Sequence, residues 1–169
     1  MLGLYENFPE NPHRIARFNT SISNKRLQQA LIQIFHHLDT ESLAIEDIAN
    51  PSLPQCTVIF EFGIAEANNF IYLDSEEKSL VLKVIQKKPF QKMDFLCSIR
   101  YYKTQNEKKT PLKFDYYMLR FTFNKNTMEM QVFHERGPMH ILPEEITAFI
   151  ANKINEKFSK KILKASDLS

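Results

Sequence analysis

The segment HERGPMH at positions 134–140 holds the residues best suited to acid–base chemistry. A histidine beside a carboxylate can move protons on a substrate or bind a metal ion. The spacing matches no metal-binding signature, so we expect no metal and no other cofactor here. Gly-Pro in the middle of the segment indicates a turn. The ionisable residues of this candidate enzyme site are His134, Glu135, Arg136 and His140.

A second candidate is one face of the expected β-sheet, which mixes aromatic and planar polar side chains. Such side chains suit stacking and bidentate hydrogen bonding. Tyrosine, phenylalanine and arginine are also the types enriched where proteins meet. The candidate binding residues are Arg100, Tyr102, Tyr116, Arg120, Gln131 and Phe133.

Three interpretations of this face stay open. In the first, the face is a solvated surface whose arginines pair across strands. In the second, it binds a protein partner or a second copy of the chain. In the third, it binds single-stranded nucleic acid whose bases stack on Tyr102 and Tyr116, although Glu61, Glu129 and Glu135 interrupt the basic surface. We take a non-enzymatic binding or assembly module as the leading hypothesis. Nucleic-acid binding is the alternative, and a small enzyme at His134, Glu135 and His140 is the second alternative.

The composition of the chain limits which of these functions it can have. The net charge is +2, from 22 basic and 20 acidic side chains, which alone does not argue for nucleic acid. The chain contains no GxGxxG, GxxxxGK[ST], HExxH or GxSxG motif. With three glycines in total, a glycine-rich phosphate loop is nearly excluded. The chain therefore contains none of these sequence motifs of common enzyme families.

Cysteine use and hydropathy bear on the compartment. Cys56 and Cys97 lie far apart in apolar runs, which is typical of buried free thiols in a reducing compartment. No apolar run approaches the roughly 20 residues of a membrane span, and the N-terminus does not resemble a signal peptide. We therefore expect a cytoplasmic protein that does not bind membranes.

Periodicity predicts three helices. In the first, apolar residues recur from Leu27 to Leu38 at helical spacing after the N-cap candidates Ser23 and Asn24. In the second, Asp74 and Glu77 suit the start of a helix. We expect its buried face to consist of Leu80, Val81, Val84 and Ile85. Pro143 suits the first turn of the third helix. The predicted ranges are 24–38, 75–87 and 143–162.

Alternating apolar residues predict strands at 57–63, 70–73, 93–103, 113–123 and 127–134. Pairing Asn124 with Thr127 brings the apolar residues of the last two strands together on one face. The same register points His134 inward beside Tyr117. A structural hydrogen bond is thus the preferred role of His134.

The element order predicts one α+β domain over residues 1–169. We expect a mostly antiparallel sheet of about five strands with helices mainly on one face. Residues 1–22 contain Pro9 and Pro12, and form either an extended arm or, from His13, a strand. The polar, basic loop Thr104–Leu112 is expected at an exposed tip.

Overall fold

The computed structural model describes residues 1–51, 53 and 55–166. These form one antiparallel sheet with helices, so the α+β class is confirmed. The helices are α1 (Asn24–Leu38), α2 (Ser75–Lys87) and α3 (Pro143–Lys157), with a short 3₁₀ turn at Ile45–Asp47. The strands are β1 (Arg14–Thr20), β2 (Leu43–Ala44), β3 (Cys56–Glu66), β4 (Asn69–Tyr72), β5 (Lys92–Gln105), β6 (Lys108–Pro111), β7 (Asp115–Asn124), β8 (Thr127–Arg136) and β9 (Leu163–Ala165).

The described part of the sheet has nine strands in the order β2-β3-β5-β7-β8-β1-β9, with β4 paired to β3 and β6 to β5. The expected count of about five was low because β2, β6 and β9 pair at places that sequence periodicity does not mark, and because a strand from His13 was only one of two alternatives. The predicted hairpin register is confirmed, since Phe123 faces Met128 and Phe121 faces Met130.

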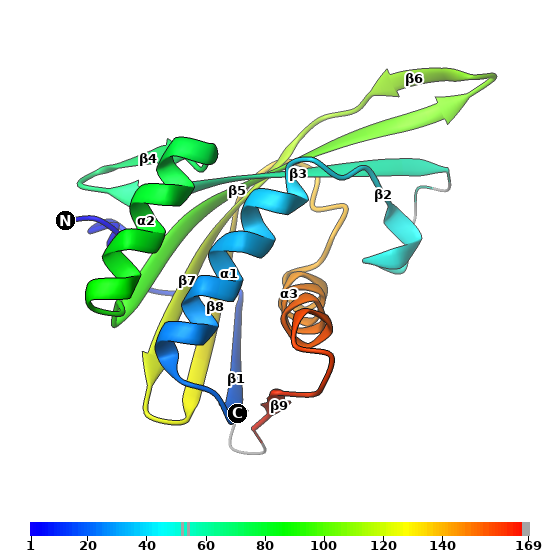
Figure 1. Cartoon of the computed structure of the whole chain (residues 1–169). Helices are drawn as coiled ribbons and strands as arrows, with labels where there is room; N and C mark the ends of the chain where they lie inside the picture. Colours follow the sequence, from blue (N-terminus) through cyan, green and yellow to red (C-terminus); the bar gives the residue numbers. More distant parts are fainter. Residues whose placement is uncertain (52, 54, 167–169) are drawn as a thin grey trace.

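The three helices lie on the same side of the sheet (Figure 1). Phe35 of α1 is buried there and stacks on Phe62 of β3 with ring centroids 3.8 Å apart. It also meets Phe95 of β5 edge to face at 5.0 Å. We call this side the helix face and the opposite side the open face. The alternation of buried and half-buried residues along β3, β5 and β7 separates the two.

The predicted ranges of α1 and α2 are confirmed, and each helix begins at the predicted cap. The side chain of Ser23 accepts a hydrogen bond from the backbone N–H of Arg26, and Asp74 accepts one from Glu77. The third helix ends at Lys157 and not at 162. Ser159 takes a left-handed backbone conformation, and Leu163 is then buried in β9, where the chain pairs with β1.

The predicted buried face of α2 is half wrong. Val81 and Ile85 are fully buried, but Leu80 and Val84 are 49% and 38% exposed. The helix lies at the edge of the helix layer beside α1, so only one of its sides can reach the core (Figure 1). The apolar residues on its outer side have no covering element in the described part of the chain.

The open face is partly covered by the N-terminal segment, residues 1–13. Its backbone joins the sheet where the N–H of Gly3 donates to Ala65 at 2.7 Å and the N–H of Asp94 donates to Gly3 at 2.7 Å. At its other end the N–H of His13 donates to Val132 at 2.9 Å. From Arg14 the chain becomes β1. Of the two predicted conformations, residues 1–13 adopt the arm and the following residues adopt the strand.

The β5–β6 hairpin projects beyond the helices (Figure 1). Its turn is formed by Asn106 and Glu107, whose backbones both have positive φ, as the tightest hairpin turns require. The side chains from Gln105 to Pro111 are exposed, which confirms the prediction of an exposed polar tip.

Candidate functional site

Arg120 is not an exposed binding residue. Its guanidinium donates to both carboxylate oxygens of Asp94, at 2.7 and 2.8 Å, and to the carbonyl of Tyr5 at 3.2 Å. The ring of Phe8 lies 4.5 Å from the guanidinium carbon. The Arg120 side chain is 17% exposed and Asp94 is fully buried. The prediction of an exposed Arg120 was wrong because the N-terminal segment folds over this part of the face.

Gln131 lies opposite Arg120 across the β7–β8 pair, and Phe133 lies two residues farther along β8. The ring of Phe133 stacks on His13 at 4.5 Å with an interplanar angle of 12°. The amide of Gln131 donates to Glu129 at 2.8 Å. Both side chains are half-buried. The N-terminal segment therefore contacts Phe133 of the predicted surface, and Gln131 is paired within the sheet.

Arg100, Tyr102 and Tyr116 lie on the remaining part of the open face and are half-buried. Arg100 approaches Glu61 at 3.9 Å, while its Nε atom is buried and has no hydrogen-bond partner among the described residues. Tyr102 pairs with Pro111 across the β5–β6 hairpin. Each of the three side chains is thus partly accessible on this face.

Beside Tyr116 the surface is hollowed, with a volume of about 640 Å³. The guanidinium carbon of Arg136 lies 4.6 Å from the ring centroid of Tyr116, and the ring of Phe114 lies 6.1 Å from the same ring. Phe114 is 37% exposed. We call this site the aromatic hollow; its lining consists of Lys113, Phe114, Tyr116, Arg136, Gly137 and Pro138.

A β-bulge brings Arg136 to the hollow. Tyr117 pairs with His134, whereas Tyr116 pairs with Arg136, so Glu135 is the extra residue on β8. Without the bulge, strict alternation would turn Arg136 to the helix face like His134. The bulge thus turns His134 and Arg136 of the HERGPMH segment to opposite faces of the sheet. Simple alternation along the sequence could not have placed Arg136 beside Tyr116.

His134 points inward, as predicted, and its ring meets Tyr117 at 5.0 Å. Its Nε2 lies 2.8 Å from Oδ1 of Asp115, which is fully buried. Asp115 also accepts hydrogen bonds from the hydroxyl of Tyr101 at 2.6 Å and from the backbone N–H groups of Met139 and His140 at 2.7 and 2.9 Å. We call this group the Asp115 cluster.

The Asp115 cluster is a hydrogen-bond network within the protein. Its carboxylate is satisfied by protein donors, and the ring of His140 meets Tyr101 edge to face at 4.8 Å. Glu135 is exposed and takes no part in it. The four ionisable residues of the candidate enzyme site therefore do not converge on one place. Asp115 was not among the residues predicted from the sequence, although a carboxylate at an inward position of an apolar strand was a signal that could have identified it.

Burial also favours the neutral forms of the tyrosine and cysteine side chains around the Asp115 cluster. Desolvation raises the pKa of Tyr101 and Tyr117 well above the ordinary tyrosine value, and in Tyr101 the hydrogen bond to Asp115 adds to the effect. Desolvation likewise raises the pKa of the Cys97 thiol. Cys97 is fully buried and unpaired, so it lacks the exposed thiolate that a nucleophile needs.

Two further observations concern metals and membranes. Across residues 1–51, 53 and 55–166, histidine, cysteine and acidic side chains form no group of three or more suited to a metal ion. In the same residues no helix combines the length and apolar character needed to cross a bilayer.

Comparison of the chain with protein-family models, with curated proteins and with solved structures found no match.

Proposed function

We propose that this chain is a non-enzymatic binding protein that holds a partner protein in the aromatic hollow. The observation that carries the proposal is the meeting of Phe114, Tyr116 and Arg136 on an uncovered part of the open face. Aromatic rings and arginine dominate the binding energy of protein interfaces. The small-enzyme alternative loses support because His134 and His140 are held in the Asp115 cluster on the other side of the sheet.

The lining indicates what the hollow accepts. Phe114, Tyr116 and Pro138 present apolar surface, and Arg136 and Lys113 supply positive charge at the same place. An apolar side chain next to a carboxylate would bury its carbon atoms on the rings and pair its charge with the guanidinium. We therefore expect a partner segment of that composition.

Site-specific photo-crosslinking tests this function. A photoreactive phenylalanine analogue at Phe114 should give one discrete protein adduct in extract of the source cells, and Arg136→Ser should abolish that adduct. The same analogue at Leu142, which is similarly exposed, is the matched control. Equal labelling from both positions, or an adduct that Arg136→Ser leaves unchanged, would contradict the proposal.

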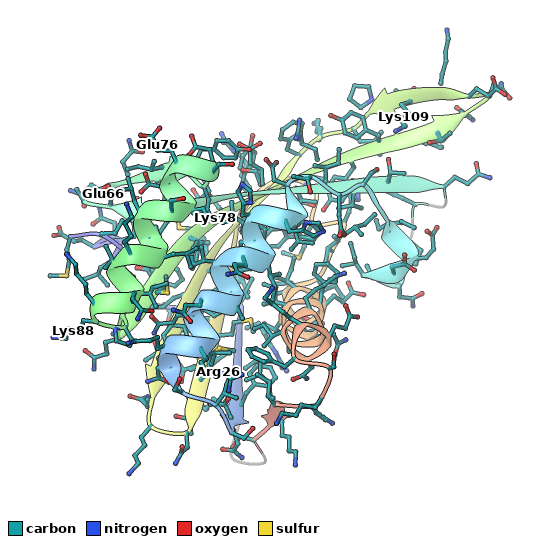
Figure 2. The ribbon with its side chains drawn as sticks, in the orientation of Figure 1. Arg26, Glu66, Glu76, Lys78, Lys88 and Lys109 are labelled. Carbon is teal, nitrogen blue, oxygen red and sulfur yellow. The ribbon has the colours of Figure 1, made fainter. Side chains whose placement is uncertain are left out.

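A second candidate function is single-stranded nucleic acid binding, because the β5–β6 hairpin next to the exposed rings is rich in lysine. Lys103, Lys108, Lys109 and Lys113 outnumber the single acidic residue of this stretch, Glu107. Figure 2 shows Lys109 on the projecting hairpin. Bases stack on aromatic rings while lysines neutralise phosphates.

Fluorescence anisotropy with a labelled oligouridylate across a salt series tests this second function. The logarithm of the affinity should fall linearly with the logarithm of salt concentration, by roughly 0.7 per neutralised phosphate. Lys108→Glu/Lys109→Glu should reduce that slope. No detectable binding at low salt, or a slope near zero, would remove nucleic acid as the ligand.

A further inference from the structure

We propose that the outer side of α2 pairs with the same side of a second copy of this chain, in an antiparallel arrangement around a two-fold axis. This surface is separate from the aromatic hollow, so the inference does not depend on the proposed function. Residues Glu77, Leu80, Val84 and Lys87 recur at helical spacing and line a groove of about 410 Å³ together with Leu2, Glu66 and Lys83.

The apolar centre of this stripe is exposed. Leu80 and Val84 are among the most exposed large apolar residues, although the helix buries Val81 and Ile85 on its other side. Two apolar residues one turn apart on a solvent-facing helix form a ridge that packs into the groove beside the same ridge of a second helix. In a two-fold antiparallel pair centred between them, Leu80 of one copy meets Val84 of the other.

The charges on α2 are arranged so that the same pairing matches opposite signs. Glu76 and Glu77 lie in its first turn, and Lys87 and Lys88 lie at its end. Figure 2 shows Glu76 and Lys88 at opposite ends of the helix. The axis that brings Leu80 to Val84 also brings the acidic end of one copy to the basic end of the other. This self-complementarity is what an isologous interface requires, and it is why a second copy fits better than an unrelated protein.

The acidic end carries a repulsion that a second copy would relieve. Burial, together with the carboxylates of Glu66, Asp74 and Glu76, raises the pKa of Glu77. Lysines from a partner helix would offset the crowded negative charge. Lys83 lies near the centre of the stripe, where the two copies would bring like charges together. The pair is therefore a weak one, formed at high protein concentration.

Sedimentation velocity across a concentration series tests the pairing. The mass of the native chain should rise with concentration from 19.9 kDa towards twice that value. Leu80→Ser/Val84→Ser should remain monomeric at every concentration, and Lys83→Ala should form dimers at lower concentration than the native chain. A native chain that stays monomeric up to its solubility limit would overturn the inference.

Charge reversal distinguishes this arrangement from other dimers. Glu76→Lys/Glu77→Lys and Lys87→Glu/Lys88→Glu each place like charges opposite one another and should each be monomeric. An equimolar mixture of the two should recover dimers, since each reversed end then meets its opposite. Lys108→Glu/Lys109→Glu is the matched control for Lys87→Glu/Lys88→Glu. It replaces two lysines by glutamates on the distant β5–β6 hairpin and should dimerise like the native chain. A mixture that stays monomeric, with both variants folded by circular dichroism, would also overturn the inference.

Discussion

Arg120 binds Asp94 through two hydrogen bonds, from Nε to Oδ1 at 2.7 Å and from Nη2 to Oδ2 at 2.8 Å, and the N-terminal segment lies over the pair. The backbone N–H of Tyr5 donates to the same carboxylate at 2.7 Å. The pair therefore fixes the segment that covers one part of the open face. The aromatic hollow lies on another part of this face, and none of the described residues covers it.

Removing the guanidinium should destabilise the fold strongly. Arg120→Ala leaves the fully buried Asp94 carboxylate without its counter-charge, and breaking a buried ion pair in this way costs about 3–5 kcal/mol. Because Arg120 is slightly exposed, we expect the lower end of that range in the free energy of unfolding measured with urea. Arg17→Ala is the control: it breaks an exposed pair with Glu129 and should cost less than about 1 kcal/mol. Equal losses in both variants would show that Asp94 does not depend on Arg120.

Replacing Asp115 should loosen the chain between β8 and α3. Asp115→Ala removes the acceptor of the buried Tyr101 hydroxyl and of three half-buried donors, at about 1–3 kcal/mol for each donor left buried and unsatisfied. We expect at least about 3 kcal/mol of lost stability, together with faster hydrogen exchange at the amides of Met139 and His140. Tyr117→Phe removes one hydrogen bond, to the carbonyl of Ile141, and should cost about 1 kcal/mol. Unchanged exchange at the two amides would contradict the assigned role.

Gly137 should not tolerate a side chain. Its φ is +114°, and an added Cβ would lie 2.3 Å from the carbonyl oxygen of Phe114 and 2.5 Å from Oδ1 of Asp115. Gly137→Ala should therefore cost more than about 2 kcal/mol and weaken binding at the aromatic hollow, whose wall it forms. Thermal unfolding measures the loss of stability. Gly63→Ala, where the closest contact of an added Cβ is 3.2 Å to Phe70, should lose less stability than Gly137→Ala. A native-like melting temperature for Gly137→Ala would show that this backbone can move.

Tyr72 gives a pH dependence at the alkaline end. Its hydroxyl donates to the carboxylate of Asp39, which raises the pKa of Tyr72 to about 12. The folded state thus favours the protonated phenol, so this contribution is complete below the unfolded value near 10. It is lost as the pH rises from there through about 12.

Ultraviolet titration of the phenolate absorbance checks this assignment. Tyr72→Phe should remove an ionisation near pH 12, and it should flatten the loss of stability between pH 10 and 12. Asp39→Asn keeps the phenol and should move its ionisation to lower pH. A native titration curve unchanged by Tyr72→Phe would contradict the assignment.

Local sequence patterns were enough to predict several elements of this fold. Ser23 and Asp74 are side-chain caps, and the apolar spacing after them placed α1 and α2 correctly. Alternation along 119–132 determined the β7–β8 register, because a slip of one residue would turn every apolar side chain to the wrong face. The same pattern placed His134 against Tyr117.

Which surfaces are covered depends on contacts between distant parts of the chain. Periodicity identifies apolar residues but not the layer that covers them, so Leu80 and Val84 on α2 were expected to be buried. The return of the N-terminal segment over Arg120 depends on contacts between residues far apart in the chain. The bulge at Glu135 reverses the side to which Arg136 points, and a bulge is set by strand pairing across the sheet. These long-range contacts, and not local preference, bring Arg136 to Tyr116.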